Sequence, residues 1–340
     1  MDLVNKIWYA KSPMSGWALI SLVLLPFSFL FYLASAARRT MYRANLLKST
    51  APPVPVVVIG GITAGGSGKT PVCISLVREL RERGHKVGVL SRGYKARPPS
   101  LPYVVDESST AEMCGDEPYL IHMQTGCKTV IDPVRRRGAQ RLYDMGVGVI
   151  ICDDGLQHYG LRRDVEILVI DSHRRYGNGL LLPAGPLREG MWRIREVDCI
   201  VENGASSSMH NYAMTLEPSS PYAIEDSKKR LNAGDCGGVC AMAGIANPPK
   251  FYDTLKSLGF TVQEVIHVSD HGTVPDETIK KHAQSMPVVM TQKDAVKYIG
   301  HGLENVWVLG VNGKLPTEFF DLVQERILTA RDNARLKGTW

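Results

Sequence analysis

One glycine-rich segment limits the fold of this chain more than any other feature of its sequence. An apolar run, Pro55–Gly60, comes before it and an amphipathic stretch, Pro71–Arg83, comes after it, which predicts a buried strand, a loop and a helix in that order. The loop follows the phosphate-binding pattern GxxxxGK[ST] except at its first position, where threonine replaces glycine. It reads Thr63-Ala64-Gly65-Gly66-Ser67-Gly68-Lys69-Thr70.

The residue types in this loop suit contact with a nucleotide. Consecutive glycines let backbone N–H groups close around phosphate oxygens, next to a helix N-terminus that carries partial positive charge. Lys69 supplies a cation for the β and γ phosphates, and Thr70 offers a hydroxyl to Mg²⁺. A glycine-rich turn without a ligand is the alternative, which the strand–loop–helix context disfavours. The loop alone does not separate a kinase from a GTPase or a transporter ATPase; because no NKxD-type guanine reader is evident, ATP is the expected nucleotide.

Short apolar runs alternate with amphipathic stretches over most of the chain. This alternation predicts an α/β fold, with a P-loop NTPase-type doubly wound parallel sheet and a second, smaller α/β domain. A polar, glycine-containing stretch, Ser219–Gly238, marks the expected boundary, so we expect an N-terminal segment over residues 1–48, a nucleotide-binding domain over residues 49–225 and a smaller domain over residues 226–340. Strands are expected at residues 55–60, 86–91, 128–132, 147–153, 165–171, 238–243, 261–267, 287–291 and 305–310, and helices at residues 71–83, 117–125, 134–145, 250–258, 277–285 and 318–331.

An uncharged apolar segment, Gly16–Ala37, precedes the alternating region. Its length is close to the roughly 20 residues that cross the hydrocarbon layer as a helix. A cleaved signal peptide, suggested by Ala34-Ser35-Ala36, and a buried core helix are the alternatives, but the run is longer than a usual signal core and no polar face breaks it. We therefore expect a membrane helix that spans the bilayer or lies in its interface. The basic residues after the segment place the remainder of the chain in the cytoplasm.

Acidic residues stand where a P-loop domain commonly holds its metal. The apolar run Val147–Cys152 ends in Asp153 and Asp154, and ligands gather at the carboxyl ends of strands in open α/β sheets. We favour a Mg²⁺ role for at least one of the two, with a turn-forming Asp-Asp-Gly as the alternative. Asp116 opens a predicted helix, where acidic caps are favoured regardless of function, and Asp270-His271 lies in a predicted loop. Chemistry alone assigns neither of them a role.

Several motifs together resemble the tetraacyldisaccharide 4'-kinase family of Gram-negative bacteria. Asp153–His158 (DDGLQH) and Leu182–Glu189 (LPAGPLRE) are the most specific of them. The resemblance also rests on Thr63–Pro71, Ser91–Tyr94, Gly115–Pro118, Leu161–Ile167, Gly177–Gly179, Ala243–Pro248, Asp270-His271 and Thr291–Lys297, and it extends from the apolar segment to about Lys297. The sequence departs from the family at Gly61, where asparagine is common, and at Gly272, where a second histidine or a polar residue is usual.

The resemblance implies an activity and a set of site residues. The family moves the γ-phosphate of ATP to the 4'-hydroxyl of tetraacyldisaccharide 1-phosphate, at the cytoplasmic face of the inner membrane, which gives the lipid A precursor lipid IVA. By resemblance, Asp116 acts as the base, supported by His271 from the second domain. The implied metal ligands are Thr70, Asp153, Asp154 and Glu189, and the implied substrate residues are Arg92, Tyr94, Arg135, Gln157, His158 and Arg188.

Two other functions remain open at this point. One is a membrane-tethered P-loop ATPase that acts as a switch, and the other is a kinase of a different membrane glycolipid. The net charge of +6 does not by itself call for nucleic acid, and we expect none as a partner. The resemblance implies the lipid substrate and the lipids of the inner membrane as partners, and we expect a monomer. The seven cysteines show neither CxxC spacing nor a paired framework, which indicates buried, inert thiols in a reducing compartment.

Overall fold

The computed structural model describes residues 3–9, 16–204, 211–245, 247–269 and 272–336. Contacts divide the chain into two compact units. The first contains Met1–Arg92, Cys127–Thr215 and Lys314–Trp340, and the second contains Gly93–Gly126 and Leu216–Gly313. These units differ from the expected division at residue 226 in three places, because Gly93–Gly126 and Leu216–Glu225 group with the second unit and Lys314–Trp340 with the first.

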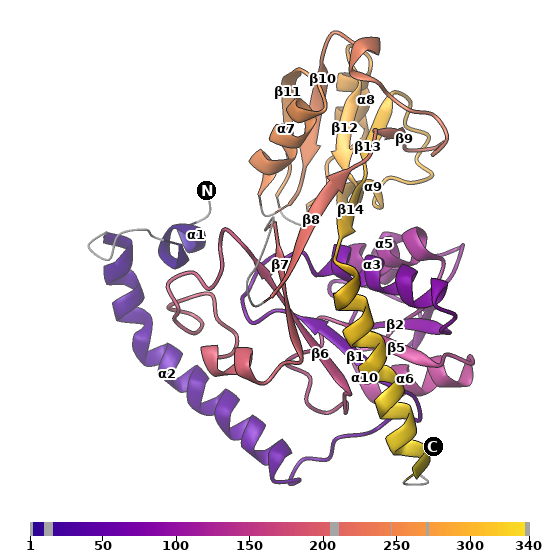
Figure 1. The fold of residues 1–340 in the computed structure, drawn as a ribbon. Helices are drawn as coiled ribbons and strands as arrows, with labels where there is room; N and C mark the ends of the chain where they lie inside the picture. Colours follow the sequence, from indigo (N-terminus) through magenta and orange to yellow (C-terminus); the bar gives the residue numbers. More distant parts are fainter. Residues whose placement is uncertain (1–2, 10–15, 205–210, 246, 270–271, 337–340) are drawn as a thin grey trace. The chain divides into compact units, whose positions relative to one another are not determined.

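The first unit is built on a parallel sheet in which its strands follow the order β8-β7-β6-β1-β5-β2-β4. Every residue of β1 and of β5 is buried, as expected for strands that are covered on both faces of a parallel sheet. The strands are β1 (Val56–Gly60), β2 (Val87–Ser91), β4 (Lys128–Ile131), β5 (Val149–Asp153), β6 (Val165–Asp171), β7 (Cys199–Asn203) and β8 (Tyr212–Pro218). The helices are α1 (Leu3–Trp8), α2 (Gly16–Arg43), α3 (Lys69–Glu82), α6 (Arg135–Asp144), the short 3-10 helix η1 (Met191–Arg195) and α10 (Thr317–Leu336) (Figure 1).

The second unit has its own five-stranded sheet, ordered β11-β10-β12-β13-β9, in which only β9 runs antiparallel to its neighbour. Alternate residues of β10 enter two separate hydrophobic clusters, Met242 with Ile279 of α8 and Ala241 with Phe251 of α7. The strands of this sheet are β9 (Tyr222–Ala223), β10 (Val239–Ala243), β11 (Val262–His267), β12 (Val288–Thr291) and β13 (Val306–Leu309). Two further strands, β3 (Tyr103–Val105) and β14 (Val311–Lys314), lie outside the five-stranded sheet. The helices of the second unit are α4 (Ala111–Cys114), α5 (Asp116–Thr125), η2 (Ala233–Asp235), α7 (Pro248–Ser257), α8 (Asp276–Ala283) and α9 (Gln292–Ala295).

The expected fold class is confirmed, and the predicted strands and most helices begin and end within two residues of the observed ones. The last helix, α10, continues to Leu336, five residues beyond its predicted end at Arg331. β7 and β8 were not predicted, because both are only partly apolar. α9, a single turn that follows β12 without a break, was not predicted either.

The N-terminal apolar segment forms α2, which continues through the basic residues to Arg43 and contains Pro26. Two buried serines attach it to the first unit: the Ser28 hydroxyl donates to the carbonyl of Leu181 (2.8 Å) and accepts from the N–H of Ala184 (3.0 Å), and Asn178 Nδ2 lies 3.4 Å from Ser21 Oγ. The opposite side of the helix exposes large apolar side chains, namely Leu19, Leu22, Val23, Phe27, Phe29, Leu30 and Leu33. The segment is therefore not a buried core helix, and within the described residues it is the one helix long and apolar enough to cross a membrane.

Candidate active site

The glycine-rich loop connects β1 to α3 and has the backbone conformation that its glycines permit. Gly65 and Gly68 adopt φ values of 102° and 90°, which side chains with a Cβ rarely adopt. Gly68 is the N-cap of α3, and a Cβ placed on it would lie 2.2 Å from Asn203 Nδ2. The amide of Asn203 donates to the carbonyl of Ser67 (3.2 Å). Asn203, at the end of β7, therefore holds the glycine-rich loop through this hydrogen bond.

Sequence reasoning missed Asn203. The available signal was its position, because it is a polar residue at the carboxyl end of a short apolar strand.

The segment before Glu189 lies against the start of the same loop. Thr63 and Leu187 form an isolated β-bridge, and the N–H of Ala64 donates to the carbonyl of Pro186 (2.8 Å). The N–H of Arg188 donates to the carbonyl of Ile62 (2.6 Å). Two motifs that are more than 100 residues apart in the sequence are thus joined by backbone hydrogen bonds.

The two aspartates that follow β5 differ in their surroundings. Asp154 has a φ of 46° and a side chain that is 38% exposed, whereas Asp153 is 2% exposed and its carbonyl accepts from Arg135 Nη2 (2.8 Å). Asp154 receives two hydrogen bonds from Arg188 (3.0 and 3.2 Å), and its Oδ1 lies 3.7 Å from Lys69 Nζ. Partial burial raises the pKa of Asp154, but the charges of Lys69 and Arg188 outweigh it and hold the pKa at about 2. Asp154 is therefore an ionised carboxylate beside the loop lysine.

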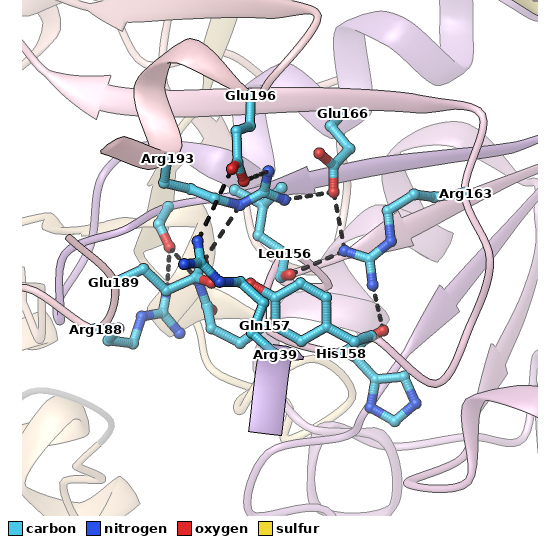
Figure 2. Close-up of polar contacts among 12 residues, drawn as sticks. Arg39, Leu156, Gln157, His158, Arg163, Glu166, Arg188, Glu189, Arg193 and Glu196 are labelled. Carbon is cyan, nitrogen blue, oxygen red and sulfur yellow. Dashed lines mark hydrogen bonds and ion pairs between the residues drawn. The ribbon is translucent and has the colours of Figure 1, made fainter. Parts of the chain in front are cut away.

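Glu189 is buried and held by neutral donors (Figure 2). Its Oε2 accepts from Gln157 Nε2 (2.8 Å) and its Oε1 accepts from the Tyr159 hydroxyl. Gln157 also donates to the carbonyl of Gly61 (3.1 Å), which Arg188 Nη2 contacts as well (2.9 Å). Burial, and then the negative charge of Glu189, raise the pKa of Tyr159, so this phenol stays protonated and can keep donating.

The predicted metal residues offer oxygen donors, which is the chemistry that Mg²⁺ prefers. A hydroxyl (Thr70) and carboxylates (Asp153, Asp154 and Glu189) therefore fit this ion. The structure does not gather the three carboxylates within ligating distance of one another. Among the described residues, the group of three potential ligands within 4.8 Å is a different one, Cys240, Glu264 and His282 of the second unit.

Most of the predicted substrate residues lie in the first unit around the Asp153–His158 loop. Arg135 is 2% exposed and Arg188 pairs with Asp154, so both cations contact the loop rather than an open surface. Burial, and then the charges of Arg135 and Arg163, lower the pKa of His158 to about 4, which keeps its imidazole neutral near pH 7. The charge of Arg92 also lowers the pKa of His158. Tyr94 is the exception among the predicted substrate residues, because it belongs to the second unit, where it is 66% exposed.

Asp116 lies in the second unit, not with the glycine-rich loop as the expected division had placed it. It is the first residue of α5, and its N-cap is Gly115 with a φ of 83°. Its Oδ2 lies 3.5 Å from Nζ of Lys297, a residue that sequence reasoning gave no role. His271 lies outside the described residues, so the structure does not bear on its predicted partnership with Asp116.

Comparisons with known proteins agree with these motifs. The model of the family described as tetraacyldisaccharide-1-P 4'-kinase (LpxK) matches residues 20–328. The tetraacyldisaccharide 4'-kinase of Shewanella amazonensis is 44% identical and covers 98% of this chain and 96% of its own length. That of Aeromonas salmonicida is 42% identical and covers 96% of each chain.

A solved structure points the same way. LpxK from Aquifex aeolicus in complex with ATP is 28% identical, with a TM-score of 0.75 over 91% of this chain and 99% of that one. This chain is therefore a kinase that belongs to the tetraacyldisaccharide 4'-kinase family.

Proposed function

We propose that this kinase transfers the γ-phosphate of ATP to the 4'-hydroxyl of a tetraacyldisaccharide 1-phosphate in lipid A biosynthesis. The hydroxyl oxygen forms a bond to the γ-phosphorus while the bond between that phosphorus and the β–γ bridging oxygen breaks, and ADP leaves. The observation that carries the proposal is the arrangement of Lys69, Asp154 and Arg188 at the mouth of the glycine-rich loop. Two cations beside one carboxylate suit the charge of a phosphoryl group in transfer.

The loop and its neighbours bind and orient ATP. Backbone N–H groups of the glycine-rich loop and the start of α3 hold the phosphates, except that of Ala64, which donates to Pro186, and Lys69 contacts the β and γ phosphates. Thr70, Asp153, Asp154 and Glu189 are the residues that would hold Mg²⁺, which would neutralise phosphate charge when bound. Gln157 and Tyr159 keep Glu189 in place through their hydrogen bonds.

Asp116 accepts the proton of the acceptor hydroxyl, and His271 supports it in this role. A positioned carboxylate that takes the proton of an alcohol is the usual partner of phosphoryl transfer. The side chain of Asp116 is 14% exposed, and its Oδ2 lies 3.5 Å from Nζ of Lys297, which helps to orient the carboxylate. Arg92, Tyr94, Arg135, Gln157, His158 and Arg188 contact the disaccharide and its phosphate.

The exposed apolar side of α2 inserts into the cytoplasmic face of the inner membrane, where the acylated acceptor resides. Basic residues at the end of this helix, among them Arg38 and Arg43, face anionic headgroups. The chain acts as a monomer.

The test is transfer of labelled γ-phosphate from Mg-ATP to detergent-dispersed tetraacyldisaccharide 1-phosphate by the full chain, with Asp116→Asn alongside. We expect label in the lipid, a kcat that falls by about 10²- to 10⁴-fold in the variant, and unchanged ATP binding. Glu112→Gln is the matched control, because Glu112 is an exposed carboxylate on the neighbouring helix α4 and its kcat should stay the same.

Two outcomes would count against the proposal. A fully active Asp116→Asn would remove Asp116 as the base. ATP binding without any lipid label would point to the ATPase switch or to another glycolipid acceptor.

A further inference from the structure

We propose that Lys297 is a positioning residue that fixes the carboxylate of Asp116 for catalysis, an inference that rests on Asp116 being the base proposed above. Lys297 is the last residue of the Thr291–Lys297 motif, to which the proposed mechanism gives no role. It lies in the second unit together with Gly272, Asp294 and Asp116.

The ammonium group of Lys297 is almost fully buried and has three oxygen partners. Its side chain is 7% exposed, and Nζ donates to the carbonyl of Gly272 at 2.9 Å. It lies 3.3 Å from Oδ1 of Asp294 and 3.5 Å from Oδ2 of Asp116. Gly272 and Asp294 accept hydrogen bonds from this ammonium group, and Asp116 forms an ion pair with it. A buried lysine in this state has little freedom to move.

Asp294 anchors the lysine independently of Asp116. This carboxylate is fully buried, and its Oδ2 accepts from the N–H of Gly244 (2.9 Å) and from the Thr291 hydroxyl (2.6 Å). Gly244 follows β10 and Thr291 ends β12, so both partners stand at the ends of adjacent central strands. The position of the Lys297 ammonium is thus set by the sheet, and Asp116 adjusts to it.

The contact brings together three segments that are far apart in the sequence. Asp116 starts α5, Lys297 follows α9, and Gly272 is the residue directly after the predicted His271. Loss of the ammonium would leave the Asp116 and Asp294 carboxylates without the cation that separates them. Asp116 would then be displaced from its orientation, and a misplacement of about 1 Å costs about 10²-fold in rate.

A neighbouring ion pair provides a matched control. Lys293 of α9 lies 3.5 Å from Oε1 of Glu117, so the same two helices are joined by a second lysine–carboxylate pair that does not involve Asp116. If Lys297 served only to dock α9 on α5, the two lysines would have similar effects.

The experiment compares Lys297→Met, Lys297→Arg and Lys293→Met in the full chain in detergent micelles, with kcat and the KM for ATP measured for each. We expect Lys297→Met to lower kcat about 10- to 100-fold with an unchanged KM for ATP, Lys297→Arg to recover at least half of that loss on a logarithmic scale, and Lys293→Met to stay within about threefold of the parent. Equal losses for the two methionine variants would show a docking role and overturn the proposal. So would an unchanged kcat in Lys297→Met.

The double variant Lys297→Met/Asp116→Asn separates this inference from the proposed function, and Lys297→Arg, which keeps a cation beside the buried Asp294, guards against a variant that fails to fold. Its kcat should equal that of Asp116→Asn alone if Lys297 acts through Asp116. Additive losses would overturn the positioning role while Asp116 remains the base. An active Asp116→Asn would instead overturn the proposed base itself.

Discussion

The two units contain the same strand–turn–helix arrangement but use it differently. In the first unit β1 leads through the glycine-rich loop into α3, and in the second β10 leads through Gly244 into α7. The N–H of Gly244 is taken by the buried carboxylate of Asp294, and α7 has proline in its first turn, which has no N–H to offer. In the first unit the support comes from Asn203, which donates to a carbonyl and so takes no N–H from the loop. The availability of backbone donors, rather than topology, therefore assigns phosphate to the first unit.

The charges near the two turns are also opposite. In the first unit one carboxylate, Asp154, meets the cations of Lys69 and Arg188. In the second unit one cation, Lys297, meets the carboxylates of Asp116 and Asp294. A local excess of positive charge suits phosphate, whereas a local excess of negative charge suits a group that accepts a proton.

Removal of Arg193 should have the largest effect, because this arginine neutralises acidic residues behind the first site. It is 3% exposed, hydrogen-bonds Glu166, and lies 3.6 Å from Glu189 and 3.6 Å from Glu196 (Figure 2). Arg193→Met removes the cation beside the buried Glu189 and weakens the pairing of Glu166 and Glu196, which keep other arginine partners, so we expect a loss of about 3–5 kcal/mol in the free energy of unfolding by urea. Arg195→Met, at an exposed position of the same short helix, should cost less than about 0.5 kcal/mol. Similar losses for both variants would show that the network does not stabilise the unit.

Gly68→Ala should break the phosphate site of the first unit. Its φ of 90° and the 2.2 Å approach of a Cβ to Asn203 Nδ2 require the loop to move, so one or two N–H contacts to phosphate are lost. Such contacts contribute about 2–3 kcal/mol, which corresponds to an increase of about 30- to 150-fold in the Kd for ATP measured by calorimetry. Gly84→Ala is the control, because Gly84 has a similar φ of 84° after α3 with no atom within 4 Å of the added Cβ. Tight ATP binding by Gly68→Ala would refute the proposed use of the loop.

The features of this structure that the sequence predicts are those whose residues are contiguous in the chain. The strands were predictable because parallel strands that are buried on both faces read as apolar runs, as Val56–Gly60 and Val239–Ala243 do. The glycine-rich loop was predictable because its residues are contiguous. Cys199–Asn203 was missed since its burial alternates and Glu202 interrupts the apolar pattern.

The cluster around Lys297 shows where local signals end. Its oxygen partners come from residues 116, 272 and 294, and neither periodicity nor composition relates three such distant segments. The placement of Gly93–Gly126 in the second unit was missed for the same reason, because long-range contacts define a unit and leave no composition change at its edges. The resemblance to a family identified the motifs, but it did not predict which of them are in contact.

Substitutions of Asn203 would sharpen the contrast between its amide and the carboxylate of Asp294. Asn203→Ala removes one hydrogen bond to the carbonyl of Ser67, so we expect a loss of about 1 kcal/mol, or about a fivefold higher Kd for ATP. Asn203→Asp should weaken ATP binding further, because a carboxylate cannot donate and repels phosphate. Asn211→Ala is the control, since Asn211 contacts Glu202 and not the loop. A weaker effect of Asn203→Asp than of Asn203→Ala would contradict the argument that donors must remain free for phosphate.

The last prediction concerns the stability of the folded chain as a function of pH, which reports the positive charge around His158 in the first unit. Burial, and then the charges of Arg135 and Arg163, hold the pKa of His158 at about 4 in the folded chain, below its ordinary 6.5. Between these values the unfolded chain binds a proton that the folded chain does not, so stability is complete above the ordinary pKa of His158 and declines as the pH falls towards its folded pKa. Asp154 acts in a different window, because its pKa of about 2 lies below its ordinary 3.8 and its contribution is lost only as the pH falls through that lower range.

The two windows do not overlap, so His158→Gln should reduce the loss of stability between about pH 7.5 and about pH 5 and leave the more acidic range unchanged. Urea midpoints at these two pH values measure the effect, and His173→Gln, at an exposed position of the same unit, is the control. If His158→Gln and the parent lost equal stability over this range, folding would not lower the pKa of His158. The excess of positive charge around the Asp153–His158 loop would then be smaller than the structure indicates, and the charge contrast between the two units would be weaker with it.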